Sequence, residues 1–248
     1  MKLDDPLKSS KLKLKQAKEH IQNLEHEIAR FFHRRPYRVF DNPISNGTFE
    51  IAVELTDPLP DKITTLCGDA ISNLFAVLDH AVAAISRLDG LGDAGCAFPI
   101  GNDAAEFFVA LQKGKLKKFP SNQIDILAGF QAYPNGFGDP IWRLKKLEQV
   151  NKHREYPAIG LVHAGSRMTT ITNGFRNSFG CVGGQWNNSE KRMVLMKFDT
   201  PFWYEVDVSF HVVFDKVEPV DRHMVIRCLN EAATVVELVV GECEQVFL

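Results

Sequence analysis

The alternation of apolar and polar positions predicts a long central helix over residues 61–87. At about 100° per residue, one side of this helix carries only large apolar side chains: Ile71, Leu74, Leu78, Val82 and Ile85. A second stripe carries mostly short polar groups and alanines, unlike the charged face of a surface helix: Asp69, Asn73, Ala76, His80, Ala83 and Arg87. Because small side chains let a second helix approach closely, the pattern predicts a helix that is covered on both sides and traps polar groups.

A second periodic segment, residues 6–33, predicts a long helix at the N-terminus. Its apolar residues alternate three- and four-residue spacings, as in a coiled coil: Leu7, Leu14, Ala17, Ile21, Leu24, Ile28 and Phe31. Ser10 is the one polar interruption, and lysines and glutamates fill the other faces. A helix with one such narrow heptad seam is expected to pack lengthwise against another helix, of the same chain or of a partner.

Shorter elements fill the rest of the chain. Two-residue alternation predicts a hairpin before the central helix, with strands at 37–41 and 49–55. Helical spacing predicts three further helices, at 104–112, 123–132 and 140–155. Alternation then returns and predicts four strands and a last helix, at 159–163, 168–172, 192–198, 205–214 and 221–245.

This order of elements predicts one α+β domain over residues 1–248. Residues 1–157 are helix-rich, and residues 158–248 hold antiparallel strands and the C-terminal helix. The expected architecture is a helical bundle with a long N-terminal helix, built on the helices at 61–87 and 140–155 and flanked by antiparallel strands. The sequence shows neither an internal repeat nor a low-complexity linker that would divide it.

Composition narrows the class of protein. Apolar residues make up 45% and charged residues 24% of the 248, which is typical of a soluble globular protein. The net charge of −2 provides no overall attraction to nucleic acid or membrane. Five scattered cysteines without a Cys-x-x-Cys pair indicate reduced thiols in a cytoplasmic protein. We expect no membrane association, because the chain has neither an apolar signal segment nor a run of about 18 apolar residues.

The first candidate site is the polar stripe of the central helix. Helical spacing makes Asp69 and Asn73 direct neighbours and places His80 on the same face two turns later. An imidazole near a carboxamide and a carboxylate can act as a general acid or base near neutral pH. The structural alternative is a buried polar network that fixes the register of two helices.

The second candidate site is the end of the helix at 140–155. Its last turns crowd Asn151, Lys152, His153 and Arg154 together. Cations there also interact favourably with the negative end of a helix, which is the structural alternative. We expect this helix to pack on the central one so that Asp69, Asn73 or His80 lies near Asn151 or His153.

No metal or cofactor is predicted. His80 and His153 could bind a metal together with Asp69, but the sequence lacks a compact ligand spacing such as His-Glu-x-x-His. A third group is basic and could contact phosphates, or form an ordinary solvated surface. It comprises Lys113, Lys115, Lys117 and Lys118, with Lys11, Lys13 and Lys15 in the N-terminal helix.

Two motifs resemble those of a bacterial family of unassigned role. That family carries Gly-Asp and then Asn-Leu-Arg-Ser-Ala-Leu-Asp-His on one helix, matched here by Gly68-Asp69 and Asn73-Leu74-Phe75-Ala76-Val77-Leu78-Asp79-His80. It later carries Asp-Lys-His-Arg, matched here by Asn151-Lys152-His153-Arg154. The resemblance covers about the first two-thirds of the chain.

The Arg-to-His spacing of that family is similar to the signature of HEPN domains. Those domains are helical, usually dimeric, and many are metal-independent ribonucleases in which His and Arg act on the scissile phosphate at a dimer interface. This chain departs from the signature, because Phe75 stands where the arginine would be. By this resemblance, RNA cleavage requires Arg154 or Arg87 to replace that arginine.

The leading prediction is a cytosolic bacterial protein with a polar pocket between the helices at 61–87 and 140–155, binding a small polar ligand or RNA. The residues assigned to chemistry are Asp69, Asn73, His80, His153 and Arg154, and those assigned to ligand binding are Arg87, Asn151 and Lys152. One alternative is a HEPN-like ribonuclease, with His80 transferring the proton and Arg154 stabilising the phosphate. Another is a scaffold that acts through the N-terminal helix. A homodimer is expected through the heptad seam or the alanine-lined stripe.

Overall fold

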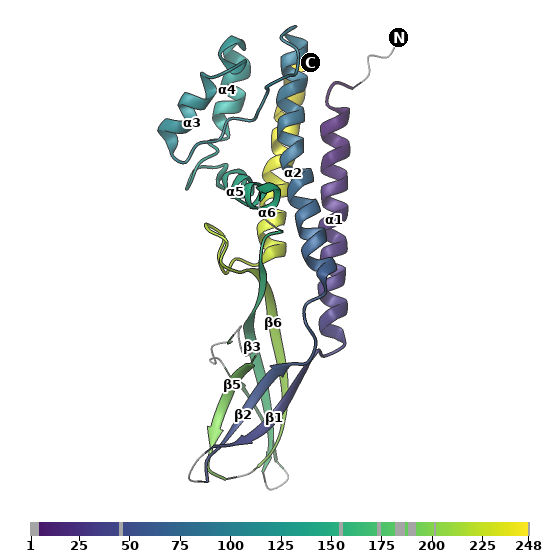
Figure 1. The fold of residues 1–248 in the computed structure, drawn as a ribbon, viewed down its shortest axis with the longest axis vertical. Coiled ribbons are helices and arrows are strands. Elements are labelled where there is room, and N and C mark those ends of the chain that lie inside the picture. The colour runs from purple at the N-terminus through teal and green to yellow at the C-terminus, as the bar shows by residue number, and fades with distance from the viewer. Residues whose placement is uncertain are drawn as a thin grey trace.

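The computed structural model describes residues 5–44, 47–153, 156–172, 175–181, 187, 192–200 and 202–247. The molecule is elongated, with its helices gathered at one end and two antiparallel sheets at the other (Figure 1). This arrangement confirms the predicted α+β class. It differs in one respect, because the sheets extend from one end of the bundle instead of flanking it.

Three long helices run side by side along the molecule (Figure 1). They are α1 (Lys8–His33), α2 (Asp61–Leu88) and α6 (Val225–Glu244). The heptad seam of α1 is buried against α2 and α6, and Leu24 and Phe31 are almost fully covered. The seam therefore finds its partner helices within the same chain. Asn73 and His80 of the alanine-lined stripe contact α1 of the same chain. The expected homodimer stays a prediction.

Helix α2 is the core of the bundle. It packs against α1, α5 (Asp139–His153) and α6, which explains why apolar residues lie on several of its sides. Among the described residues it is the one helix with the length and composition to cross a membrane, but 56% of its apolar window is buried inside the fold. Contacts within the chain therefore account for its apolar character.

Shorter helical segments lie to one side of the long helices (Figure 1). They are α3 (Ala104–Leu111), a 3-10 turn (Leu116–Lys118) and α4 (Ser121–Gly129). Asp103 caps α3 by accepting a hydrogen bond from the Glu106 backbone N–H. Helix α5 lies across the bundle and buries Ile141, Leu144 and Leu147. Helices α3, α4 and α5 were predicted, with ends that differ by up to three residues, whereas the 3-10 turn was not.

The strands form two three-stranded antiparallel sheets. The first has the order β1-β2-β5, with β1 (Tyr37–Pro43), β2 (Phe49–Leu55) and β5 (Arg192–Phe198). The second has the order β4-β3-β6, with β3 (Ile159–Thr172), β4 (Phe175–Cys181) and β6 (Trp203–Phe214). The predicted hairpin is confirmed as the antiparallel pair β1 and β2. Tyr204 of β6 hydrogen bonds with Asp41 of β1, which ties the two sheets together.

Three details of the strand region differ from the sequence prediction. The two strands expected at 159–163 and 168–172 are one continuous strand, β3, with a register shift between His163 and Gly165. Strand β4 was not predicted. Helix α6 begins at Val225 instead of residue 221, because the preceding Met224 pairs with Val213.

Candidate functional site

The polar residues of α2 are divided between two neighbouring helices. Gly68 and Ser72 contact α5, whereas Asn73 and His80 contact α1. Of the predicted stripe, Asn73 and His80 therefore bond to α1, whereas Asn151 of α5 reaches the Gly68 carbonyl, in the peptide group that joins Gly68 to Asp69. That contact uses residues one position earlier, which are rotated by about 100° around the helix.

The contact between α2 and α5 is a closed polar network in which one buried acceptor, Asn151 Oδ1, has no hydrogen-bond partner among the described residues. Asn151 Nδ2 donates to the Gly68 carbonyl at 3.2 Å and to Ser72 Oγ at 2.9 Å. Ser72 Oγ donates to Glu148 Oε2 at 3.1 Å, and Lys152 Nζ lies 2.9 Å from Glu148 Oε1. The Glu148 side chain is only 4% exposed. A buried carboxylate with these partners joins the helices and leaves little access for a ligand.

Gly68 makes this close contact possible. A Cβ atom at this position would lie 2.4 Å from a ring carbon of Tyr156 and 2.9 Å from Asn151 Oδ1. Phe75 lies on the same side of α2, with its ring centroid 5.4 Å from Lys152 Nζ. The residue at the position of the family's arginine therefore faces α5.

The contact between α2 and α1 begins with an interhelical hydrogen bond. Lys13 Nζ donates to Asn73 Oδ1 at 2.9 Å, and Asn73 Nδ2 donates to the Asp69 carbonyl at 2.8 Å. Asn73 is 8% exposed. With both ends of its carboxamide bonded inside the fold, Asn73 serves to hold the two helices together.

Further along the same contact, α1 and α2 border an open hollow of about 330 Å³. It is lined by Ser9, Asp79, His80, Ala83, Arg87, Asp93 and Cys96. His80 Nδ1 lies 2.8 Å from Ser9 Oγ, so a serine of α1 orients the imidazole. Arg87 Nη1 lies 3.3 Å from Asp93 Oδ2 on the rim. We call this space the His80 hollow.

Asp79 adds a second titratable group to the His80 hollow. Burial raises the pKa of its carboxyl group, while a 3.2 Å hydrogen bond from the Phe98 backbone N–H and the charge of Lys152 act in the opposite direction. The hollow therefore holds two titratable groups, the carboxyl group of Asp79 with its raised pKa and the imidazole of His80. Both can exchange protons or hydrogen bonds with a polar ligand.

The structure thus brings some predicted residues together and separates others. His80 and Arg87 share the His80 hollow. Asn151 and Lys152 belong to the α5 network, and no hydrogen bond between described residues joins them to Asp69, Asn73 or His80. Arg154 and the side chain of His153 lie outside the described residues.

Sequence reasoning missed several of the groups that matter here. Asp79 was assigned to a different neighbour from His80, and its hydrogen bond to Phe98 agrees with this, yet its carboxyl group also borders the hollow. Ser9 lies among lysines that resemble a solvated surface. For Glu148 a signal was present, since it follows the buried Leu144 by one helical turn.

Three of the cysteines are buried thiols. Cys67, Cys228 and Cys243 are free and buried, and burial raises the pKa of each thiol. Within the described ranges, no group of three or more His, Cys, Asp or Glu side chains is placed to hold a metal ion.

No family model, curated protein or solved structure matches the chain. The resemblance of its two motifs to a bacterial family and to HEPN domains therefore stays a prediction.

Proposed function

We propose that the protein binds a small polar ligand in the His80 hollow. The observation that carries this proposal is the convergence of Asp79, His80 and Arg87 from α2 with Ser9 from α1 on one open space. Its volume of about 330 Å³ lies at the lower end of the range for small-molecule sites, which is about 300–1,000 Å³. A ligand there would meet hydrogen-bond donors and acceptors within a few ångströms of each other.

The charges in the hollow favour a ligand that carries an amine or hydroxyl donor. Two carboxyl groups, Asp79 and Asp93, stand against one guanidinium, Arg87. A nucleic-acid phosphate would approach both carboxyl groups, and like charges in a partly buried site repel. Of the two predicted ligand classes, we therefore propose the small polar molecule over RNA.

The ribonuclease hypothesis has one observation in its favour, because His80 and Arg87 share the hollow. Against it, Arg87 is paired with Asp93, and the position of the family's arginine, Phe75, faces α5 instead of the hollow. RNA cleavage is therefore a second hypothesis. The rate at which the protein cleaves a fluorescent oligoribonucleotide tests it. A cleavage rate at least about 100-fold lower in His80→Ala than in the wild type would support it.

A titration with simple probes tests the binding proposal. We expect ethanolamine and serine to shift the NMR signals of the His80 imidazole, and inorganic phosphate to leave them unchanged. Because a hydrogen bond to a charged group contributes about 1.5–3 kcal/mol, His80→Ala and Asp79→Asn should each weaken binding at least about tenfold.

His26→Ala is the matched control, since it removes an exposed imidazole of α1 that does not line the hollow. This variant should bind the probes as the wild type does. Failure of both amine probes to bind at millimolar concentration, or equal binding by His80→Ala and wild type, would contradict the proposal.

The setting we propose for this function is the cytosol. Cys67, Cys96, Cys228 and Cys243 are all free thiols, as expected for a protein of a reducing compartment.

A further inference from the structure

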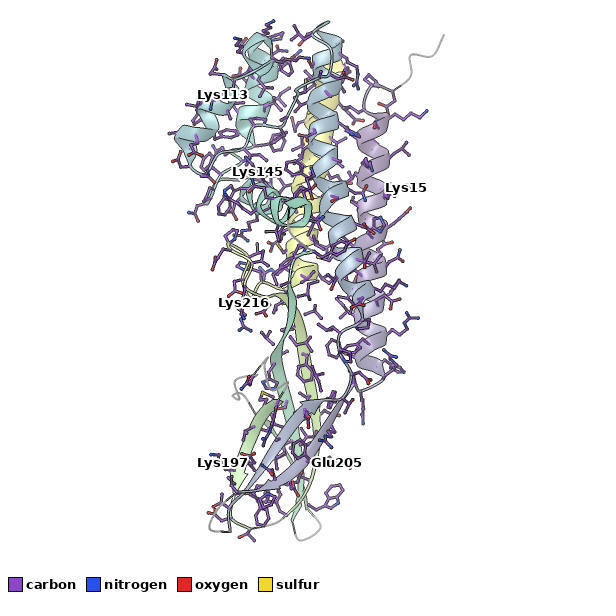
Figure 2. The ribbon with its side chains drawn as sticks, viewed as in Figure 1. Lys15, Lys113, Lys145, Lys197, Glu205 and Lys216 are labelled. Carbon is purple, nitrogen blue, oxygen red and sulfur yellow. The ribbon has the colours of Figure 1, made fainter. Side chains whose placement is uncertain are left out.

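A second pocket borders residues 95–100, next to the segment that lines the His80 hollow. It has a volume of about 200 Å³ and is bordered by α2, residues 95–100, the end of α3 and residues 113–116. Cys96 lines both spaces. Lys113, which lines this pocket, lies beside the short helices at the end of the molecule away from the sheets (Figure 2). We call it the lysine pocket.

The charge of the lysine pocket has a single sign. Lys113 and Lys115 line it, and neither an aspartate nor a glutamate does. Lys117 and Lys118 follow in the same turn. Within the described part of the chain, none of these four lysines forms an ion pair or a side-chain hydrogen bond.

The lysines of α1 behave differently, although the sequence grouped them with this segment. Lys11 pairs with Asp5 and Glu244, Lys13 donates to Asn73, and Lys15 lies 3.9 Å from Glu19 of the same helix. Lys11 and Lys13 therefore link α1 to other helices, and Lys15 has an acidic partner within α1. The ammonium groups of the lysine pocket remain available for a partner from outside the chain.

The wall of the lysine pocket is apolar. Val82, Phe98, Ile100 and Leu116 contribute large apolar side chains, and Phe98, Ile100 and Leu116 are buried. A bare inorganic anion would contact the lysines but would gain nothing from this wall. An apolar body on the anion would be removed from water, which favours binding by about 25 cal/mol per Å² of area covered.

We propose that the lysine pocket binds a small amphipathic anion, that is, a carboxylate or phosphate group on a short apolar body. The ammonium group of lysine is a compact charge that pairs with either head group. The volume of about 200 Å³ is below that of a typical drug-sized site, so the body has the size of a short alkyl chain or one aromatic ring. This site is independent of the His80 hollow, where carboxyl groups outnumber guanidinium groups.

Calorimetric titration of the full chain tests the proposal with four probes. Hexanoate and phenyl phosphate combine both features, inorganic phosphate lacks the apolar body, and hexan-1-ol lacks the charge. We expect at least one amphipathic anion to bind at least tenfold more tightly than both single-feature probes. Its binding should weaken as salt rises, because salt screens the lysine charges. The preferred amphipathic probe identifies which combination of head group and apolar body the pocket favours.

Two double variants locate the site. Lys113→Gln/Lys115→Gln removes the charges that line the pocket and should weaken binding at least tenfold. Lys117→Gln/Lys118→Gln makes the same change in net charge within the same turn but outside the pocket, and should bind within about twofold of the wild type. All four lysines are at least partly exposed, so neither variant should lose its fold, which a thermal melt checks.

Several results would overturn the proposal. Equal binding by the wild type and Lys113→Gln/Lys115→Gln would show that the anion does not bind in the lysine pocket. An equal loss in Lys117→Gln/Lys118→Gln would indicate diffuse surface charge. Hexan-1-ol or inorganic phosphate binding as tightly as the amphipathic anions would show that one of the two features is unnecessary. His80→Ala should leave this binding unchanged, so failure here is distinct from failure of the His80 hollow.

Discussion

The two polar contacts of α2 differ in how completely they are closed. On the α5 side, Ser72, Asn151 and Glu148 form a buried network in which Glu148 has partners at both carboxylate oxygens. On the α1 side, one hydrogen bond joins Lys13 to Asn73, and the contact then opens into the His80 hollow. Neighbouring residues of α2 thus contribute to a buried contact between helices on one side and to an accessible pocket on the other.

The closeness of the covering helix explains the difference. On the α5 side, Gly68 has no side chain, so Asn151 reaches the α2 backbone directly. On the α1 side, the long side chain of Lys13 spans the gap to a short carboxamide. Chemically similar polar groups therefore stabilise the fold where backbones meet and stay open to ligands where side chains hold them apart.

The largest effect is expected from breaking the closed contact. Glu148→Ala would leave the part-buried Ser72 and Asn151 without their shared acceptor and would remove the ion pair of the more exposed Lys152. Because stranded buried polar groups each cost about 1–3 kcal/mol, we expect a loss of about 3 kcal/mol in the free energy of unfolding. Urea denaturation monitored by circular dichroism measures this.

Glu148→Gln is the matched control for that change. It keeps an oxygen that accepts from Ser72 and removes only the charge that pairs with Lys152, which is more than half exposed. The expected loss is about 1 kcal/mol. If Glu148→Ala and Glu148→Gln both unfold at the same urea concentration as the wild type, the closed network does not stabilise the fold.

A smaller effect is expected on the open side. Asn73→Ala removes the hydrogen bonds to Lys13 and to the Asp69 carbonyl, and should cost about 1 kcal/mol. A double-mutant cycle with Lys13→Met isolates the interhelical bond, and a coupling energy of about 0.5–1.5 kcal/mol is expected. A coupling energy of zero would mean that Lys13 and Asn73 do not interact in solution.

Long periodic segments explain how much of the fold is predictable. Helices α1 and α2 each match their predicted bounds within two residues, because the helical period repeats over many turns. Strand β4 was not predicted because it contains Asn177, Ser178 and Gly180, which have low β-propensity. It lies at a sheet edge next to β3. Strand β3 was divided because the register shift near Gly165 interrupts its alternation.

The candidate site is less predictable, because its geometry depends on which neighbouring helix covers each row of side chains along α2. Gly68 and Asp69 are adjacent in sequence and differ by about 100° in direction. Periodicity identifies both rows but does not assign α5 to the row that contains Ser72 and α1 to the row that contains Asn73. The partners from α1, Ser9 and Lys13, lie in a lysine-rich stretch that is typical of a solvated surface.

The smallest expected effect concerns the pH dependence of stability at Asp79. Burial raises the pKa of this carboxyl group above 3.8, so the folded state favours the protonated form. Its contribution to stability is complete below pH 3.8 and is lost as the pH rises through the raised pKa. Asp79→Asn resembles the protonated form at every pH and keeps an oxygen that accepts from the Phe98 N–H.

We therefore expect Asp79→Asn to be slightly more stable than the wild type at pH 7, with the difference shrinking as the pH falls toward 3.8. Glu27 provides the opposite case, because Arg30 and Lys62 lower its pKa to about 2. Glu27→Gln should be less stable than the wild type at pH 7, and this deficit should shrink only as the pH falls below 4.5. Urea denaturation at pH 3.5, 5 and 7 measures both differences. If Asp79→Asn were instead less stable than the wild type at pH 7, as we expect for Glu27→Gln, the ionised Asp79 carboxylate would stabilise the fold. The expectation that its burial beside the His80 hollow destabilises the folded state would then be wrong.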